Sequence, residues 1–295
     1  MDKNPDLHEI DKTDNWSRLL KIKYKKELGE ISREYPHKRA LLIDYRDVER
    51  FGKAGIALAD ELLENPGKVL EDVWDAIKNS QLIRIKDGKE PKGINIRFTN
   101  LPKKTGIRNI RSDDINKFLS VEGILRKTTE VRPRVVEAVF RCPAGHFTVK
   151  KQKYGKFIEP EGCATDGCSF KKLELLPKRS KFVDSQKLRI QESPEGLRGG
   201  EQPQTLDVDV TDDLSGTVAP GDRVIINGIL RSMQRIVKGE KSTVFDIFLE
   251  CNSIEIAEKE FEEVEIDEKA EDEIRALSSD PLIYAKITHS IAPTI

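Results

Sequence analysis

The stretch FLSVEGILRKTTEVRPRVVEAVFRC, residues 118–142, contains two runs rich in Val, Ile, Leu and Phe, separated by a short basic turn. Short β-branched runs of this kind, broken by Gly, Pro and Asp, are typical of β-strands. Similar runs follow toward the C-terminus, among them SKFVDSQKLRIQE (180–192), TLDVDVTDDL (205–214), DRVIINGILRSM (222–233) and STVFDIFLECNSIEI (242–256). About seven strands at this spacing predict an antiparallel barrel or sandwich. We favour a closed OB-type barrel, because residues 142–172 interrupt the series like an insertion.

The chain before these strands has a helical pattern. Apolar residues recur at intervals of three and four in residues 15–32 and 55–79, and Pro66 is placed to begin a second helix in the latter stretch. The turn-rich KDGKEPKG, residues 86–93, marks a boundary. We therefore predict an α+β protein with several subdomains. They are a helical N-terminal subdomain (1–93), an OB-fold β-barrel (94–141 and 173–254), an inserted metal-binding subdomain (142–172) and a C-terminal helical linker (255–295).

Charge is distributed unevenly along the 295 residues, although the net charge is only −1. Residues 96–254 hold 28 basic and 21 acidic side chains, whereas residues 255–295 hold 4 and 12. A basic middle followed by an acidic end suggests a polyanion-binding module joined to a solvated connector, with ordinary solvated surfaces as the alternative. No apolar run is long enough for a membrane span, and the polar start does not resemble a targeting signal. We expect a protein of a reducing compartment, either cytosol or nucleus.

Cysteine and histidine are rare, and four of these eight residues lie in the inserted segment. Cys142 and His146 form one close pair, and Cys163 and Cys168 form another. Two close pairs separated by a loop are the pattern of a tetrahedral structural zinc site, and four protein ligands leave no open position for catalysis. A disulfide is disfavoured by a reducing compartment, and core thiols by the Gly, Asp and Thr neighbours. Cys251 lies in a strand pattern and is predicted to be a buried free thiol.

Two groups of basic residues are candidates for contact with a nucleic acid. The first group surrounds the turn in the opening stretch, and the second lies near the tip of a long hairpin at about residues 229–249. The candidates are Arg126, Lys127, Arg132 and Arg134 in the first group, and Arg231, Arg235, Lys238 and Lys241 in the second. Cations on a barrel rim can follow a sugar-phosphate backbone. The alternative for both groups is a solubilising edge-strand surface.

Catalytic motifs are absent from the sequence. It contains no phosphate loop and no Gly-rich dinucleotide fingerprint, and we assign no catalytic residue. His8, His37 and His289 lie in polar or helical contexts without a nearby nucleophile. We therefore expect this chain alone not to hydrolyse ATP.

Together these segments resemble the N-terminal part of archaeal-type minichromosome maintenance (MCM) proteins, the replicative DNA helicases. The likeness runs through IRNIRSDDINKFLSVEGILRKTTEVRPRV (107–135), the metal loop, residues 187–230, the hairpin and DPLIYAKITHSIAPTI (280–295). It implies a hexameric ring, single or double, that binds single-stranded and double-stranded DNA in its channel. It also implies an archaeal cytoplasmic, nucleoid-associated protein. An ATPase domain that binds ATP and magnesium would follow Ile295 in the parent helicase.

The resemblance also implies a loop, residues 192–204, that communicates between this ring and the motor. Its residues of interest are Glu192, Gly199, Gly200, Glu201, Gln202 and Pro203. Two positions depart from the family pattern: His146 replaces a cysteine found in some relatives, and Gln204 stands where an arginine is common. The alternative function is a stand-alone OB-fold and zinc protein that binds single-stranded DNA, and a weaker one is a zinc-stabilised scaffold without nucleic acid.

Overall fold

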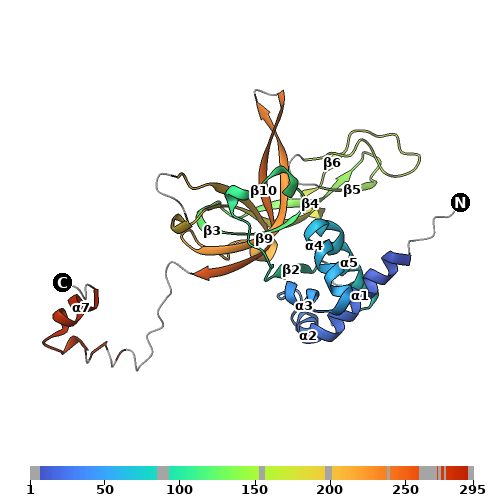
Figure 1. Cartoon of the computed structure of the whole chain (residues 1–295). Helices are drawn as coiled ribbons and strands as arrows, with labels where there is room; N and C mark the ends of the chain where they lie inside the picture. Colours follow the sequence, from blue (N-terminus) through green and yellow to red (C-terminus); the bar gives the residue numbers. More distant parts are fainter. Residues whose placement is uncertain are drawn as a thin grey trace. The chain divides into compact units, whose positions relative to one another are not determined.

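The structure is a computed structural model, and it describes residues 7–84, 93–152, 157–196, 201–237, 240–258, 271, 274–275 and 277–291. The chain divides into two units, residues 1–258 and 259–295. Within the first unit, a helical subdomain, a barrel and an inserted arm are distinguishable (Figure 1). In the second unit, α7 (Ile283–Ile291) is helical, in agreement with the predicted helical linker. None of the described helices is long and apolar enough to cross a membrane.

The helical subdomain forms around a continuous apolar core. Its elements are α1 (Leu7–Lys23), α2 (Lys25–Glu34), β1 (Ala40–Asp44), α3 (Tyr45–Glu49), α4 (Gly52–Glu64) and α5 (Pro66–Asn79). The apolar stripes of α1 and α5 meet, so that Trp16, Leu19 and Val73 are fully buried. Pro66 occupies the first turn of α5, as the sequence predicts. The Asp44 side chain caps α3 by accepting from the Arg46 amide at 2.8 Å.

Strand β2 (Asn95–Thr99) joins the helical subdomain to the barrel. It pairs in parallel with β1, and Ile96 and Phe98 complete the helical core. On its other side, the Arg97 guanidinium donates to the Asn252 carbonyl at 2.7 Å and pairs with Asp213. Strand β2 therefore contacts both subdomains, and the predicted boundary at residue 93 places it in the barrel.

The barrel closes through five strands: β3 (Phe118–Thr128), β7 (Lys181–Gln191), β8 (Thr205–Thr211), β9 (Arg223–Val237) and β10 (Glu240–Glu258). Their order is β3-β9-β10-β8-β7, and β7 pairs back to β3. The pair β8–β10 is parallel and the others are antiparallel. Strands β9 and β10 approach closely at Gly228, where a Cβ would lie 2.3 Å from the Glu250 carbonyl oxygen, so glycine is required there. The predicted OB-type barrel is thus confirmed.

The insertion between β3 and β7 begins as a continuation of the barrel and then leaves it. Strand β4 (Arg132–Arg141) pairs with β7 at its start and with β5 (Phe147–Lys151) and β6 (Glu174–Leu175) at its end. The last residues of β4 therefore form part of the arm that carries the predicted metal site. Strands β9 and β10 also extend beyond the barrel as a hairpin (Figure 1). Strand β10 runs to Glu258, so residues 255–258 of the predicted linker are in a β-strand.

Candidate metal centre and nucleic-acid interface

The first metal-ligand pair lies on a tight turn between β4 and β5. Cys142 directly follows β4, and His146 directly precedes β5. The Gly145 amide donates to the Cys142 carbonyl at 2.9 Å, and the Cys142 amide donates to the His146 carbonyl at 3.1 Å. Gly145 has φ of +88°, a conformation that glycine adopts readily. This turn brings the two side chains to the same side of the hairpin.

The second pair is held by another local turn. The Cys168 amide donates to the Thr165 carbonyl at 3.1 Å, and the Cys163 amide donates to the Phe170 carbonyl at 3.0 Å. The Ala164 amide also donates to the Thr148 hydroxyl at 3.0 Å, which ties this turn to β5. The loop therefore returns to the β4–β5 turn and brings the pairs together.

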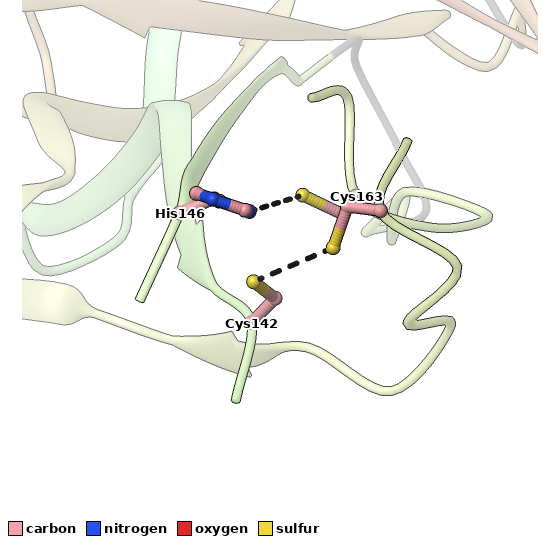
Figure 2. A group of neighbouring side chains, drawn as sticks. Cys142, His146 and Cys163 are labelled. Atoms are coloured by element: carbon pink, nitrogen blue, oxygen red, sulfur yellow. Dashed lines mark hydrogen bonds between the residues drawn. The ribbon is translucent and has the colours of Figure 1, made fainter. Parts of the chain in front are cut away.

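The four side chains form a compact cluster that fits a tetrahedral metal ion. Their ligand atoms all lie within 4.8 Å of one another. The sulfurs of Cys142 and Cys168 are 3.9 Å apart, and the Cys163 sulfur is 3.8 Å from His146 Nδ1. Donors bound to one tetrahedral zinc lie about 3.5–3.8 Å apart, whereas a disulfide needs about 2.05 Å. Figure 2 shows Cys142, His146 and Cys163 converging on a common centre.

The electrostatics of the cluster also suit a cation. Hydrogen bonds from the backbone and hydroxyl of Thr165 lower the pKa of Cys163 to about 6, which favours the thiolate that a metal requires. A backbone hydrogen bond from Phe170 acts to lower the pKa of Cys168, but burial and the neighbouring Cys163 and Cys142 raise it overall. A bound divalent cation would relieve this crowding of sulfurs. Cys251 lies in the barrel core, where burial raises its pKa to about 12, so it is a buried thiol apart from the cluster.

Most of the predicted DNA-contacting residues of the barrel share its outer face. Leu188, Val208, Leu230 and Leu249 point into the core, so the alternate residues on these strands point outward. The neighbouring strands run in the order β9, β10, β8, β7 and β4. Glu250, Asp209 and Lys187 are directly opposite one another, and further charged side chains lie on the same face to either side of them. We call the whole set the charge row: Arg231, Glu250, Asp209, Lys187 and, on β4, Arg132 and Arg134.

The charge row has cations at both ends and acids in the middle. Arg231 donates to Glu250 at 2.8 Å and to the side-chain oxygen of Asn116 at 3.1 Å. Lys187 Nζ lies 3.8 Å from Asp209 Oδ1. Arg231 is therefore anchored at the base of the hairpin, and any phosphate it binds must compete with Glu250. The sequence prediction missed Lys187, Asp209 and Glu250.

The remaining predicted cations lie at the barrel seam and on the hairpin. Arg126 and Lys127 are exposed at the end of β3, and Lys127 is paired in register with Arg189 of β7. Arg235 and Lys241 are exposed on the hairpin. Lys241 is directly opposite Ile236 and therefore points to the other face from Arg235. Lys238 lies outside the described residues.

A salt-bridge cluster holds the two ends of the predicted communication loop together. Arg108, in the short 3₁₀ turn η1 (Ile107–Asn109), donates from Nε and Nη2 to both oxygens of Glu192 at 3.0–3.2 Å. It also pairs with Glu201. Glu192 accepts two further bonds, from the Arg108 amide at 2.9 Å and the Gln204 amide at 3.0 Å. The Gln204 contact uses the backbone, so replacing the family's arginine leaves it intact.

The C-terminal end of the loop, from Glu201 to Gln204, lies beside a cleft of about 570 Å³. Glu201, Gln202 and Gln204 line it together with Arg111 and Ile247 at the hairpin base. Pro203 belongs to the same irregular segment. Gly199 and Gly200 lie outside the described residues. The loop and the hairpin base thus share a surface.

Comparison with known proteins finds relatives of this chain among DNA replication proteins. A family model described as the MCM OB domain matches residues 106–234. The chain is 32% identical over 267 residues to the minichromosome maintenance protein MCM of Saccharolobus solfataricus, covering 88% of this chain and 38% of that protein. It is 31% identical over 230 residues to the DNA replication licensing factor MCM4 of Arabidopsis thaliana, covering 69% and 27%.

A solved structure extends the likeness to three dimensions. It is a 1.8 Å crystal structure of the N-terminal domain of an archaeal MCM, which matches with a TM-score of 0.70 and 31% identity. The match covers 84% of this chain and 99% of that one. The chain thus spans well under half of the two full-length relatives but nearly all of the solved domain.

Proposed function

The chain belongs to the minichromosome maintenance family, and from this premise we propose that it is the DNA-gripping, ring-forming N-terminal region of a replicative helicase. The observation that carries the proposal is the outer face of the barrel. In OB folds, oligonucleotides bind across the second and third strands and the loops that join strands one to two and four to five. Here those strands are β7 and β8, and the two connections are the metal-bearing arm and the β9–β10 hairpin.

The residues proposed to bind DNA contact it through its phosphates. Arg and Lys side chains on a barrel face read charge and backbone geometry without base edges, which suits a helicase that must act on every sequence. Arg126, Lys127, Arg132 and Arg134 would hold the strand near the arm. The hairpin would add Arg235, Lys238 and Lys241. In a ring, each subunit would present these cations to the same channel.

The metal cluster is proposed to hold zinc in a structural role. Cys142, His146, Cys163 and Cys168 supply four soft or borderline donors, a set that suits zinc better than calcium or magnesium. When bound, the ion would cross-link the β4–β5 turn to the 163–168 turn. Few of the arm's side chains are fully buried, so this cross-link would replace the missing core.

The proposal also covers assembly of the chain into a ring and communication of that ring with the motor domain. We infer a homo-hexameric ring, and ATP with magnesium would bind in the motor domain of the parent helicase. The loop at residues 192–204 would transmit the state of the motor to the hairpin base, since both line the same cleft. The Arg108–Glu192 cluster would hold that loop in a defined position.

Fluorescence anisotropy of a labelled single-stranded oligonucleotide, titrated across a salt series, tests the DNA-binding role. We expect the double variant Arg126→Ala, Lys127→Ala to bind more weakly to all sequences. Its log–log salt slope should be flatter by about 0.7 for each phosphate that the variant no longer neutralises. A matched control is Lys25→Ala, Lys26→Ala on α2, which removes the same charge from exposed positions of the helical subdomain. Equal affinities and slopes in the two variants would reject the barrel face as the DNA path.

A further inference from the structure

Asp209 is a buried carboxyl group in the middle of the charge row. Its neighbours Val208 and Val210 point into the barrel core, so its side chain points to the outer face. It is nevertheless only 5% exposed. Among the described residues, its Oδ2 atom has no hydrogen-bond partner, and Oδ1 lies 3.8 Å from Lys187 Nζ. A buried and incompletely paired carboxylate is costly for a fold to keep.

Charged groups surround Asp209 on every neighbouring strand. Lys187 of β7 and Glu250 of β10 are directly opposite it in register, and Arg134 of β4 is close enough to interact electrostatically. The next charges outward are Arg231, which is bonded to Glu250, and Asp207, which is bonded to Arg189. Burial raises the pKa of Asp209 to about 6, while Arg134 acts to lower it and Glu250 to raise it.

We propose that DNA binding at this face takes up a proton at Asp209, so that this residue limits affinity at neutral pH and makes it pH-dependent. The inference rests on the proposed DNA-binding function. A phosphate backbone held by Arg134 and Arg231 must pass over the row that contains Asp209 and Glu250. Its negative charge disfavours the ionised carboxylate, and protonation removes one of the two repelling charges without breaking the Arg231–Glu250 pair.

The sign and size of the effect follow from linkage. Above pH 6 the free protein has lost the proton that the complex retains, so affinity falls as pH rises; well below pH 6 both states hold the proton and affinity is constant. If the docked strand raises the pKa by ~1 unit, affinity falls about fivefold between pH 6 and pH 8. The Asp209→Asn variant resembles the protonated form. It should bind about ninefold more tightly than the unmodified chain at pH 8, but only about twofold more tightly at pH 6.

The experiment measures anisotropy of a labelled oligo-dT strand from pH 5.5 to pH 8 at constant ionic strength. The control is Asp207→Asn, which removes a carboxylate from the same strand and the same face, two residues away. Asp207 is half-exposed and paired with Arg189, so its loss should raise affinity similarly at every pH. Every group other than Asp207 and Asp209 is the same in all three proteins. The difference between Asp209→Asn and the other two therefore isolates the proposed proton.

Calorimetry in two buffers of different ionisation enthalpy supplies an independent count of protons. At pH 7, the unmodified chain should take up about 0.4 proton more than Asp209→Asn for each DNA site bound. Should Asp209→Asn fail to fold, Glu250→Gln decides, because losing that charge should move the fall in affinity to lower pH. Parallel pH profiles for the unmodified chain and Asp209→Asn, or an unmoved Glu250→Gln profile, would overturn the proposal. Absence of DNA binding at every pH would instead reject the proposed function, and the coupling with it.

Discussion

Replacing Arg108 with Gln is expected to destabilise the chain and to loosen the segment around residues 192–204. The guanidinium makes three bonds of 3.0–3.2 Å to the Glu192 carboxylate and a further contact with Glu201. Gln preserves part of the side-chain length but removes the charge and the fork of donors that matches a carboxylate. Glu192 would then keep only its two backbone donors, from Arg108 and Gln204.

The expected loss of folding free energy lies between the values for breaking a buried ion pair and a surface ion pair. Removing one partner of a buried pair costs about 3–5 kcal/mol, whereas exposed pairs contribute about 0–1 kcal/mol. The Glu192 side chain is 10% exposed and that of Arg108 is 35% exposed. Two backbone donors also remain, so we expect a loss of about 2 kcal/mol. For a domain of this size, that corresponds to a fall in melting temperature of about 4–8 °C.

Thermal unfolding followed by circular dichroism measures this loss, and Arg189→Gln is the control. Arg189 makes a similar two-bond contact with Asp207 at 2.6 and 2.9 Å, but both side chains are about half exposed. The control should therefore lose less than about 1 kcal/mol. Hydrogen exchange at residues 201–204 should be faster in Arg108→Gln and unchanged in Arg189→Gln. Equal melting temperatures, or unaltered exchange in Arg108→Gln, would refute the role of Arg108 in holding the loop.

Three further predictions concern the metal, the buried acid and the assembly. Metal analysis should find one zinc for each chain, lost in His146→Ala and kept in Cys251→Ala; the reverse pattern would show the ligand assignment to be wrong. Asp209→Asn should raise the free energy of unfolding at pH 7 by about 1–3 kcal/mol, because the folded pKa of about 6 exceeds the unfolded value of about 3.9. The free energy of unfolding of the unmodified chain therefore falls as pH rises from 4 to 6. Urea titrations in which Asp209→Asn is no more stable than the unmodified chain at pH 7 would contradict this prediction. Light scattering should find a hexamer in the absence of nucleotide, whereas a monomer at high protein concentration would contradict the ring. An ATPase assay of this chain should show no hydrolysis.

The parts of the fold that sequence predicts well are those set by local chemistry. The barrel strands follow from alternation of apolar and polar residues, and the start of α5 follows from Pro66. The position of β2 was not predictable in this way. It pairs with β1, more than fifty residues earlier, and its apolar side chains would suit either core. Only the pairing of distant strands decides which core receives them.

The candidate site could also be predicted from the sequence only where its contacts are local. The spacing of Cys142, His146, Cys163 and Cys168 is enough to predict that they converge, because each pair closes a short turn. The surroundings of the cations are not local. Arg231 meets Glu250 across a hairpin, and Asp209 is covered by residues from neighbouring strands. Alternating Asp207 and Asp209 in TLDVDV indicates an outward face, but no pattern within one strand reveals that the second of them is buried.

Photocrosslinking to single-stranded DNA tests the central claim most directly, because it reports where the strand lies. The photoreactive amino acid p-benzoyl-phenylalanine would replace Phe245 on the hairpin in one variant and Ile56 on α4 in another. The two native side chains are 50% and 54% exposed, so accessibility alone does not distinguish them. The account predicts an efficient, salt-sensitive crosslink at position 245 and little at position 56. Equal crosslinking at the two positions, or crosslinking at position 56 alone, would contradict it.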